Sequence, residues 1–152
     1  MILIPHLVVS GVIATKINFL PLALILAFLG HYLLDFLPHN EYSIENIEAK
    51  KWKESKPDFL KVGMDFFAGI FFIILIHLAK GTDYYILALV CFCGILPDII
   101  TFIYFVYPNN RFLKWHYGLH QKIHVFKYKK ISDKWRIFSQ ISVVIFLLAF
   151  LI

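Results

Sequence analysis

The sequence has few charged side chains and few cysteines for its length. Asp, Glu, Lys and Arg make up 16% of the 152 residues, against about 25% in soluble globular domains. With 60% hydrophobic residues, such a chain has too little polar surface to cover a core of this size in water. The composition therefore argues against a soluble globular protein, and it also excludes disorder, collagen and coiled coil.

The two cysteines do not form a disulfide framework. Cys91 and Cys93 lie two residues apart in an apolar run. This separation is too short for an ordinary disulfide, and the flanking residues lack the partners of a zinc knuckle. The thiols therefore give no information about the redox compartment.

Long apolar runs dominate the sequence, and the mean hydropathy of the whole chain is +0.73. Four segments satisfy or approach the length of about 20 residues that a helix needs to cross a bilayer. A fifth, at the amino terminus, is shorter and lacks a cleavage site, so we expect a retained first helix or a re-entrant half-helix. The predicted spans are residues 2–17, 19–37, 59–78, 84–107 and 135–152. The sequence thus predicts one all-α, membrane-embedded domain over residues 1–152, an integral helical bundle with about five transmembrane helices.

Lysine and arginine are distributed unequally between the connections. Of the 15 basic residues, all but Lys16 and Lys80 lie in or beside the two long polar stretches, residues 38–58 and 108–134. Because positively charged loops stay in the cytoplasm, we expect a cytoplasmic amino terminus and an extracytoplasmic carboxyl terminus in the cell's inner membrane. The net charge of +5 then reflects this topology, and no nucleic-acid partner is expected.

Nine ionisable residues are predicted to gather near the cytoplasmic end of the bundle. An ionisable side chain inside a span costs about 2.5 to 3.5 kcal/mol on insertion scales, so each one needs a reason. The predicted topology places three carboxylates within about 5 to 15 Å of the cytoplasmic surface, with six histidines bordering the same layer. The set comprises Asp35, Asp65, Asp98, His6, His31, His39, His116, His120 and His124. His77, near the opposite end of its span, lies outside the set.

The spacing of these residues suits metal binding. His31 and Asp35 lie four residues apart, so a helix presents both on one face. In Leu96-Pro97-Asp98 the proline removes a backbone donor, a disruption tolerated where a helix lines a cavity. Imidazole and carboxylate ligands favour zinc, with manganese or iron next, and the size of the set allows one to three ions.

Three of the histidines recur every four residues in the second long stretch. At about 100° per residue, His116, His120 and His124 form a stripe beside an apolar face. This pattern predicts an amphipathic helix at the membrane interface that directs its imidazoles at the bundle. The basic side chains on its other side are candidates for binding a lipid phosphate. They are Arg111, Lys114 and Lys122.

Each of these candidate ligands can also have a simpler, structural role. A single Asp or His in a span can hydrogen-bond a neighbouring helix, and a histidine stripe in a basic loop can contact acidic lipids. The gathering of nine ionisable residues at one depth is harder to explain in this way and favours a metal site.

Two short patterns resemble known metal-dependent hydrolases. His31-Tyr32-Leu33-Leu34-Asp35 followed by His39 resembles the histidine, aspartate, histidine run of the zinc-dependent phospholipase C and P1 nuclease superfamily. An early His6, then Leu96-Pro97-Asp98 and a closing histidine cluster resemble the bacterial inner-membrane metal-dependent hydrolases. The second likeness covers most of the chain in order. It implies a small multispanning hydrolase that requires a metal.

The expected function is that of a metal-dependent hydrolase that cleaves a phosphoester of a lipid at the cytoplasmic leaflet. Asp35, Asp65 and Asp98 are the candidate catalytic carboxylates, one of them bridging ions or acting as a base. The alternative is a non-catalytic membrane protein that binds metal or haem, as a transporter or an electron carrier. Transport needs a polar path through both leaflets, and the outer half offers little beyond His77. A haem needs two facing histidines, whereas His31 and His77 are predicted to lie at different depths.

Overall fold

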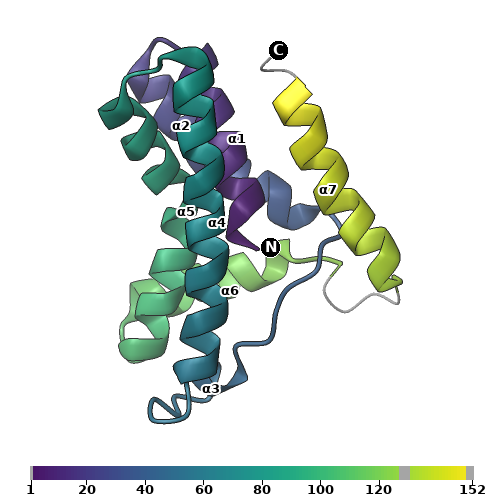
Figure 1. Cartoon of the computed structure of the whole chain (residues 1–152). Coiled ribbons are helices and arrows are strands. Elements are labelled where there is room, and N and C mark those ends of the chain that lie inside the picture. Colours follow the sequence, from purple (N-terminus) through teal and green to yellow (C-terminus); the bar gives the residue numbers. More distant parts are fainter. Residues whose placement is uncertain (1, 127–130, 150–152) are drawn as a thin grey trace.

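The computed structural model describes residues 2–126 and 131–149. These residues form seven helices and contain no strand, which confirms the predicted all-α class (Figure 1). The helices are α1 (Leu3–Lys16), α2 (Leu20–Phe36), α3 (Glu45–Glu48), α4 (Lys56–Lys80), α5 (Tyr84–Val106), α6 (Arg111–Ile123) and α7 (Asp133–Ala149).

Local sequence accounts for several helix ends. α4 is followed by Gly81, whose φ of 63° is a left-handed cap that glycine adopts without a steric penalty. Asp83 and Asn110 cap α5 and α6 by accepting hydrogen bonds from amides of the first turn. α2 ends before Pro38, as its sequence predicts. Pro97, in contrast, lies inside α5 without ending it.

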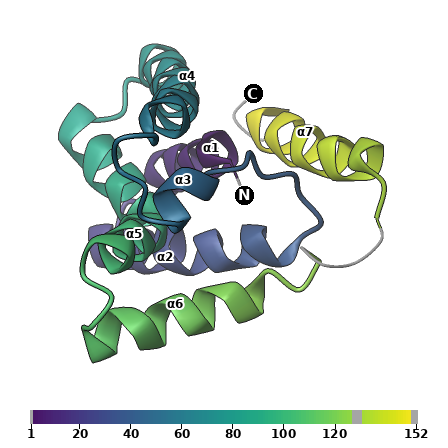
Figure 2. The ribbon, with the colours of Figure 1, turned by 90° about the horizontal axis from the view of Figure 1, so that it is seen from below.

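α1 is the central helix of the bundle. It contacts α2, α4, α5 and α7, which surround it in the view from below (Figure 2). Eight of its 14 residues are buried. The short amino-terminal segment is therefore the structural centre of the domain.

The interior of the bundle is apolar towards one end and polar towards the other. The short connections that join α1 to α2 and α4 to α5 lie at one end, at the top of Figure 1, and α3 and α6 lie at the other. Buried apolar side chains pack mainly between the first end and the middle, and the buried His and Asp side chains lie beyond them towards α6. The apolar core consists of Leu7, Val12, Ala14, Ala23, Ala27, Ile76, Leu87, Val90, Cys91 and Ile95.

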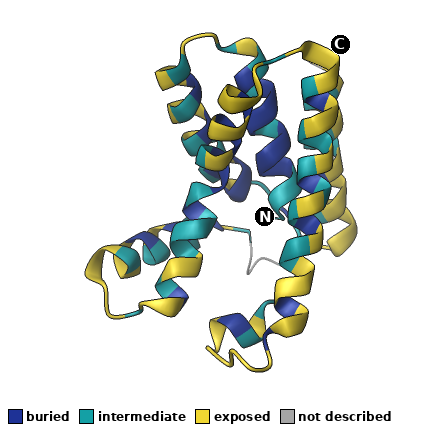
Figure 3. Ribbon diagram, turned by 60° about the vertical axis from the view of Figure 1, so that its left-hand side comes forward, coloured by how far each residue is buried: buried dark blue, intermediate teal, exposed yellow. Residues whose placement is uncertain are grey.

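Two helices, α4 and α5, are long and apolar enough to cross a membrane by length and composition. α1 and α2 are apolar but shorter. Their 14 and 17 residues correspond to about 21 and 26 Å, less than the roughly 30 Å of a bilayer core. The described helices therefore supply two candidate spans, and the predicted number of five is not established by helix length. Exposed positions lie on the outer faces of the helices and buried positions gather between them (Figure 3). Many of the exposed residues are large and apolar.

α1 and α5 approach closely at Gly94. A Cβ atom at this position would overlap the hydroxyl of Ser10 and lie 3.0 Å from its Cβ. The Ser10 hydroxyl is held in place because it donates a hydrogen bond of 2.7 Å to the carbonyl of His6. We expect Gly94→Ala to lower the free energy of unfolding by about 1 to 3 kcal/mol, because overpacking forces the two helices apart.

Thermal unfolding of the detergent-solubilised protein measures this effect. Gly63→Ala is the matched control, since a Cβ at Gly63 meets nothing within 4 Å. Alanine is favoured over glycine inside a helix by about 1 kcal/mol, so this variant should be slightly more stable than the parent. Equal melting temperatures for the two variants would contradict the close approach at Gly94.

Candidate metal centre

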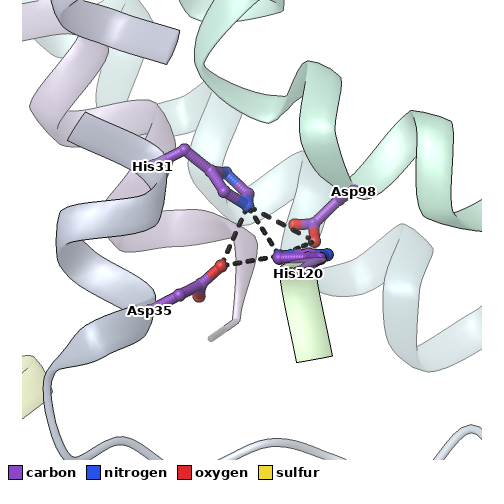
Figure 4. Close-up of side chains that lie close together, drawn as sticks. All are labelled: His31, Asp35, Asp98 and His120. Carbon is purple, nitrogen blue, oxygen red and sulfur yellow. Dashed lines mark hydrogen bonds and ion pairs between the residues drawn. The ribbon is translucent and has the colours of Figure 1, made fainter. Parts of the chain in front are cut away.

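Four side chains from three helices converge on one point, and we call them the first ligand group. His31 and Asp35 come from α2, Asp98 from α5 and His120 from α6 (Figure 4). Each offers one possible ligand atom, and these atoms lie within 4.8 Å of one another. The group could therefore hold a metal ion.

The distances within the first ligand group match a tetrahedral ion. Nε2 of His31 lies 3.0 Å from Asp35 Oδ2 and 3.6 Å from Asp98 Oδ1. Nε2 of His120 lies 2.8 Å from Asp35 Oδ2 and 3.8 Å from Asp98 Oδ1. The two Nε2 atoms are 3.2 Å apart. Four ligands at about 2.0 to 2.1 Å from a tetrahedral zinc are about 3.3 Å from one another, so these residues fit an ion with little movement.

Hydrogen bonds on the far side of the imidazoles determine which nitrogen faces the group. Nδ1 of His31 lies 2.8 Å from the carbonyl oxygen of Gly94 and must carry the proton that it donates. In the neutral ring Nε2 then presents a lone pair to Asp35. Nδ1 of His120 lies 2.8 Å from the hydroxyl of Thr101, which accepts its proton in the tautomer whose Nε2 presents a lone pair. Lone pairs and carboxylate oxygens repel one another unless a cation lies between them, and such outer hydrogen bonds are typical of metal-binding histidines.

A second ligand group shares Asp35 with the first. Asp35, His39 and His124 also present ligand atoms within 4.8 Å of one another. Nε2 of His39 lies 3.1 Å from His124 Nδ1, and Nε2 of His124 lies 3.4 Å from Asp35 Oδ2. Nδ1 of His39 donates to the Leu37 carbonyl at 2.7 Å, so in the neutral ring its Nε2 also presents a lone pair.

Glu41 adds a second carboxylate to this group. Its Oε1 lies 2.9 Å from His39 Nε2 and 2.8 Å from His124 Nδ1. Partial burial disfavours the charged carboxylate, but hydrogen bonding, with His124 as the main partner, outweighs it and holds the pKa of Glu41 well below its usual range. Burial also disfavours a charged His124, yet hydrogen bonds to Asp35 and Glu41 raise its pKa. The two carboxylates thus favour the protonated form of His124.

Sequence reasoning did not identify Glu41, although a signal for it exists. Glu41 follows His39 by two residues, after the helix-ending Pro38. Where the backbone is extended, as at Leu37, residues i and i+2 lie on the same side of the chain. An acidic residue two positions after a candidate ligand in such a segment is therefore a candidate ligand itself.

α7 holds this segment in place. Nη1 of Arg136 donates to the carbonyl of His39 at 3.1 Å, and Nε2 of Gln140 donates to the carbonyl of Asn40 at 2.8 Å. Both donors lie on one face of α7, four residues apart. The helix therefore fixes the backbone that carries His39 and Glu41.

His6 lies against the first ligand group. Its ring stacks on that of His31, with centroids 4.0 Å apart, and its Nε2 lies 3.4 Å from Asp35 Oδ1. The residue is 1% exposed, and neither ring nitrogen has a hydrogen-bond partner among the described residues. Buried imidazole nitrogens without a partner are costly. A cation beside Asp35 would relieve this cost.

Three of the predicted ligands lie outside both groups, namely His6, Asp65 and His116. Asp65 accepts hydrogen bonds from the amides of Leu3 and Ile4 and from the hydroxyl of Tyr42, so it caps the amino terminus of α1. His116 is buried on α6 with its Nε2 2.9 Å from the hydroxyl of Tyr32. Burial lowers the pKa of His116, which keeps the imidazole neutral.

The predicted phosphate-binding residues lie on the outside of α6. This helix turns His116 and His120 towards the bundle, as the stripe predicts. Its basic side chains are exposed to solvent and do not line the large cavity beside the ligand groups. They are Arg111, Lys114 and Lys122. His77 lies in the last turn of α4, at the end of the bundle away from the ligand groups. Its Nδ1 donates to the carbonyl of Thr82 at 2.8 Å.

We expect Glu41→Gln to remove one of two bound ions. The amide keeps the shape of the side chain but loses the charge that attracts a divalent cation, whereas the first ligand group does not contain Glu41. The zinc content of zinc-loaded protein, measured by metal analysis, should fall from about two ions per chain to about one. Glu45→Gln is the matched control, because Glu45 is exposed and accepts a hydrogen bond from Ser43. Unchanged metal content in Glu41→Gln would remove Glu41 from the site.

Comparisons of the chain with known protein families, with curated proteins and with solved structures found no match.

Proposed function

We propose that the protein is a membrane-bound, metal-dependent hydrolase that uses a two-ion centre to cleave a phosphoester of a lipid. The observation that carries this proposal is the position of Asp35, which belongs to both ligand groups. A carboxylate shared between two neighbouring ions is typical of two-metal hydrolases.

The donor set supports zinc, with manganese or iron as the next candidates. Imidazoles supply most of the ligands, and three carboxylates supply the rest, from Asp35, Asp98 and Glu41. Two divalent cations held by three carboxylates leave a net positive charge. Such a centre attracts an anionic phosphate ester.

The least buried ligands support an approach of the substrate from the side of Asp98 and Glu41. The side chains of Asp98 and Glu41 are each 28% exposed, whereas those of His31 and Asp35 are fully buried. Both exposed carboxylates line the same cavity. When bound, divalent cations would lower the pKa of water and stabilise charge on a phosphoryl oxygen. Asp98 is then placed to accept a proton as a general base.

The proposed location is the inner membrane, with the metal centre at the cytoplasmic leaflet. The exposed apolar faces of α4 and α5 support this location, as do the basic residues gathered in the long stretches.

We expect a phosphatase reporter that works only outside the cytoplasm to be active when fused to the carboxyl terminus and inactive when inserted within residues 49–54. Activity of the second fusion would overturn this orientation.

Metal analysis and a hydrolysis screen test the proposed function. We expect purified protein to contain zinc or manganese and to show no Soret band in its absorption spectrum. It should release a product from a mixture of phospholipids and polyprenyl phosphates. A chelator should abolish this release, and added zinc should restore it. A Soret band, or bound metal that crosses a vesicle membrane without any hydrolysis, would instead establish the electron carrier or the transporter.

A further inference from the structure

A large cavity beside the metal centre has one polar and one apolar side. Its volume is about 900 Å³. On the polar side lie five members of the ligand groups. They are His39, Glu41, Asp98, His120 and His124. On the other side the cavity is lined by apolar residues of α4 and α5.

The apolar side is formed by one face of each helix, and on α5 this face also carries Asp98 and Thr101. On α4 the lining positions run from Phe59 to Phe66 and recur at intervals of three or four residues. On α5 they run from Phe92 to Phe105, about 20 Å at a rise of 1.5 Å per residue. One leaflet of a bilayer core is about 15 Å thick. Because Asp98 lies near the middle of the α5 positions, about 10 Å of this wall extends to either side of the metal centre, which accommodates part of the hydrocarbon chain of one lipid.

The apolar wall of this cavity is formed by the two helices best suited to a membrane. On its outer side α4 exposes large apolar residues such as Phe67 and Phe71, which are 71% and 57% exposed. On its inner side Gly63 lines the cavity and leaves space, since a Cβ there meets nothing within 4 Å. The cavity and the lipid-facing surface are thus separated by a single helix.

We propose that this cavity binds the hydrocarbon chain of one lipid molecule, with the anionic headgroup at the metal centre. The position of the headgroup rests on the proposed function, whereas the position of the chain rests on the apolar walls. The polar end contains cation-binding donors that select an anionic group. Apart from Asp98 and Thr101, the lining residues of α4 and α5 are apolar or glycine and offer no side-chain hydrogen bonds, which suits a hydrocarbon chain. Gly63 determines how much room the chain has.

Photo-crosslinking in vesicles tests this proposal without measuring hydrolysis. The probe is phosphatidic acid with a diazirine near the end of one acyl chain, mixed into phosphatidylcholine vesicles that contain the full-length protein. Mass spectrometry then maps the labelled residues. We expect label on Val62, Phe66 and Ile95 inside the cavity, in addition to label from bulk lipid on Phe67 and Phe71.

Gly63→Leu should remove the label inside the cavity, because its side chain occupies the space of the acyl chain. The label on Phe67 and Phe71 should not change. Gly118→Leu is the matched control: Gly118 also lies within a helix and has open space at its Cβ, but it does not line the cavity. If Gly63→Leu does not fold, Gly63→Ala replaces it, with a smaller loss of cavity label expected.

Label confined to bulk-lipid positions, or cavity label that survives the filling of Gly63, would overturn the proposal. The two proposals fail separately. Cavity label without any hydrolysis would leave the chain-binding site in place and defeat the proposed reaction. Hydrolysis without cavity label would support the proposed reaction and defeat the chain-binding site.

Discussion

Asp35→Asn is expected to release both metal ions and to abolish hydrolysis, while the protein still inserts and folds. Asp35 is fully buried, and its Oδ2 lies 3.0 Å from His31 Nε2 and 3.4 Å from His124 Nε2. Because the carboxylate belongs to both ligand groups, the loss of its charge weakens the binding of both ions. We expect metal affinity to fall by at least about 100-fold, the upper range for residues that only support a ligand. Metal analysis and the hydrolysis assay measure the two losses.

Two further aspartates make this test specific. Asp83→Asn should keep its full metal content, because Asp83 is exposed and caps α5, a role that asparagine also fills. Asp65→Asn removes a buried carboxylate that binds the first amides of α1 instead of the ligand groups. Loss of metal in Asp65→Asn with full retention in Asp35→Asn would place the site at the amino terminus of α1.

His31→Ala and His120→Ala are each expected to abolish activity, and the double variant should be hardly worse than either. The two Nε2 atoms lie 3.2 Å apart although the residues are 89 positions apart in sequence. Ligands of one ion act as a unit, so the effect of removing both is far from additive. A double-mutant cycle on metal affinity and hydrolysis measures this coupling.

His77→Ala is the internal control for the histidine pair. His77 is hydrogen-bonded to the carbonyl of Thr82 at the other end of the bundle, so this variant should keep its metal. If instead α6 served only to contact acidic lipids, His120→Ala would leave the metal content untouched. Additive losses from His31 and His120 would show that they do not bind the same ion.

Periodicity in the sequence determined which faces of the helices carry polar groups. The four-residue spacing of His31 and Asp35 is a local property of any helix, and so is the stripe of His116, His120 and His124. Alternating spans also predict that these groups meet at one end of the bundle. The structure brings His31, Asp35, Asp98 and His120 into one group and His39 and His124 into the next, around the same carboxylate.

Tertiary packing decided which polar residue meets which partner. Asp65 and Asp98 look alike in the sequence, each a carboxylate within a span. Asp65 lies beside the free amides at the start of α1 and caps them, whereas Asp98 faces His31 and His120. Glu41 reaches His39 and His124 because α7 fixes the backbone of the segment after α2. Helix periodicity fixes the direction of a side chain relative to the axis of its helix. The neighbours of that side chain depend on how the helices pack against one another. In this bundle the other helices pack around α1 at the centre.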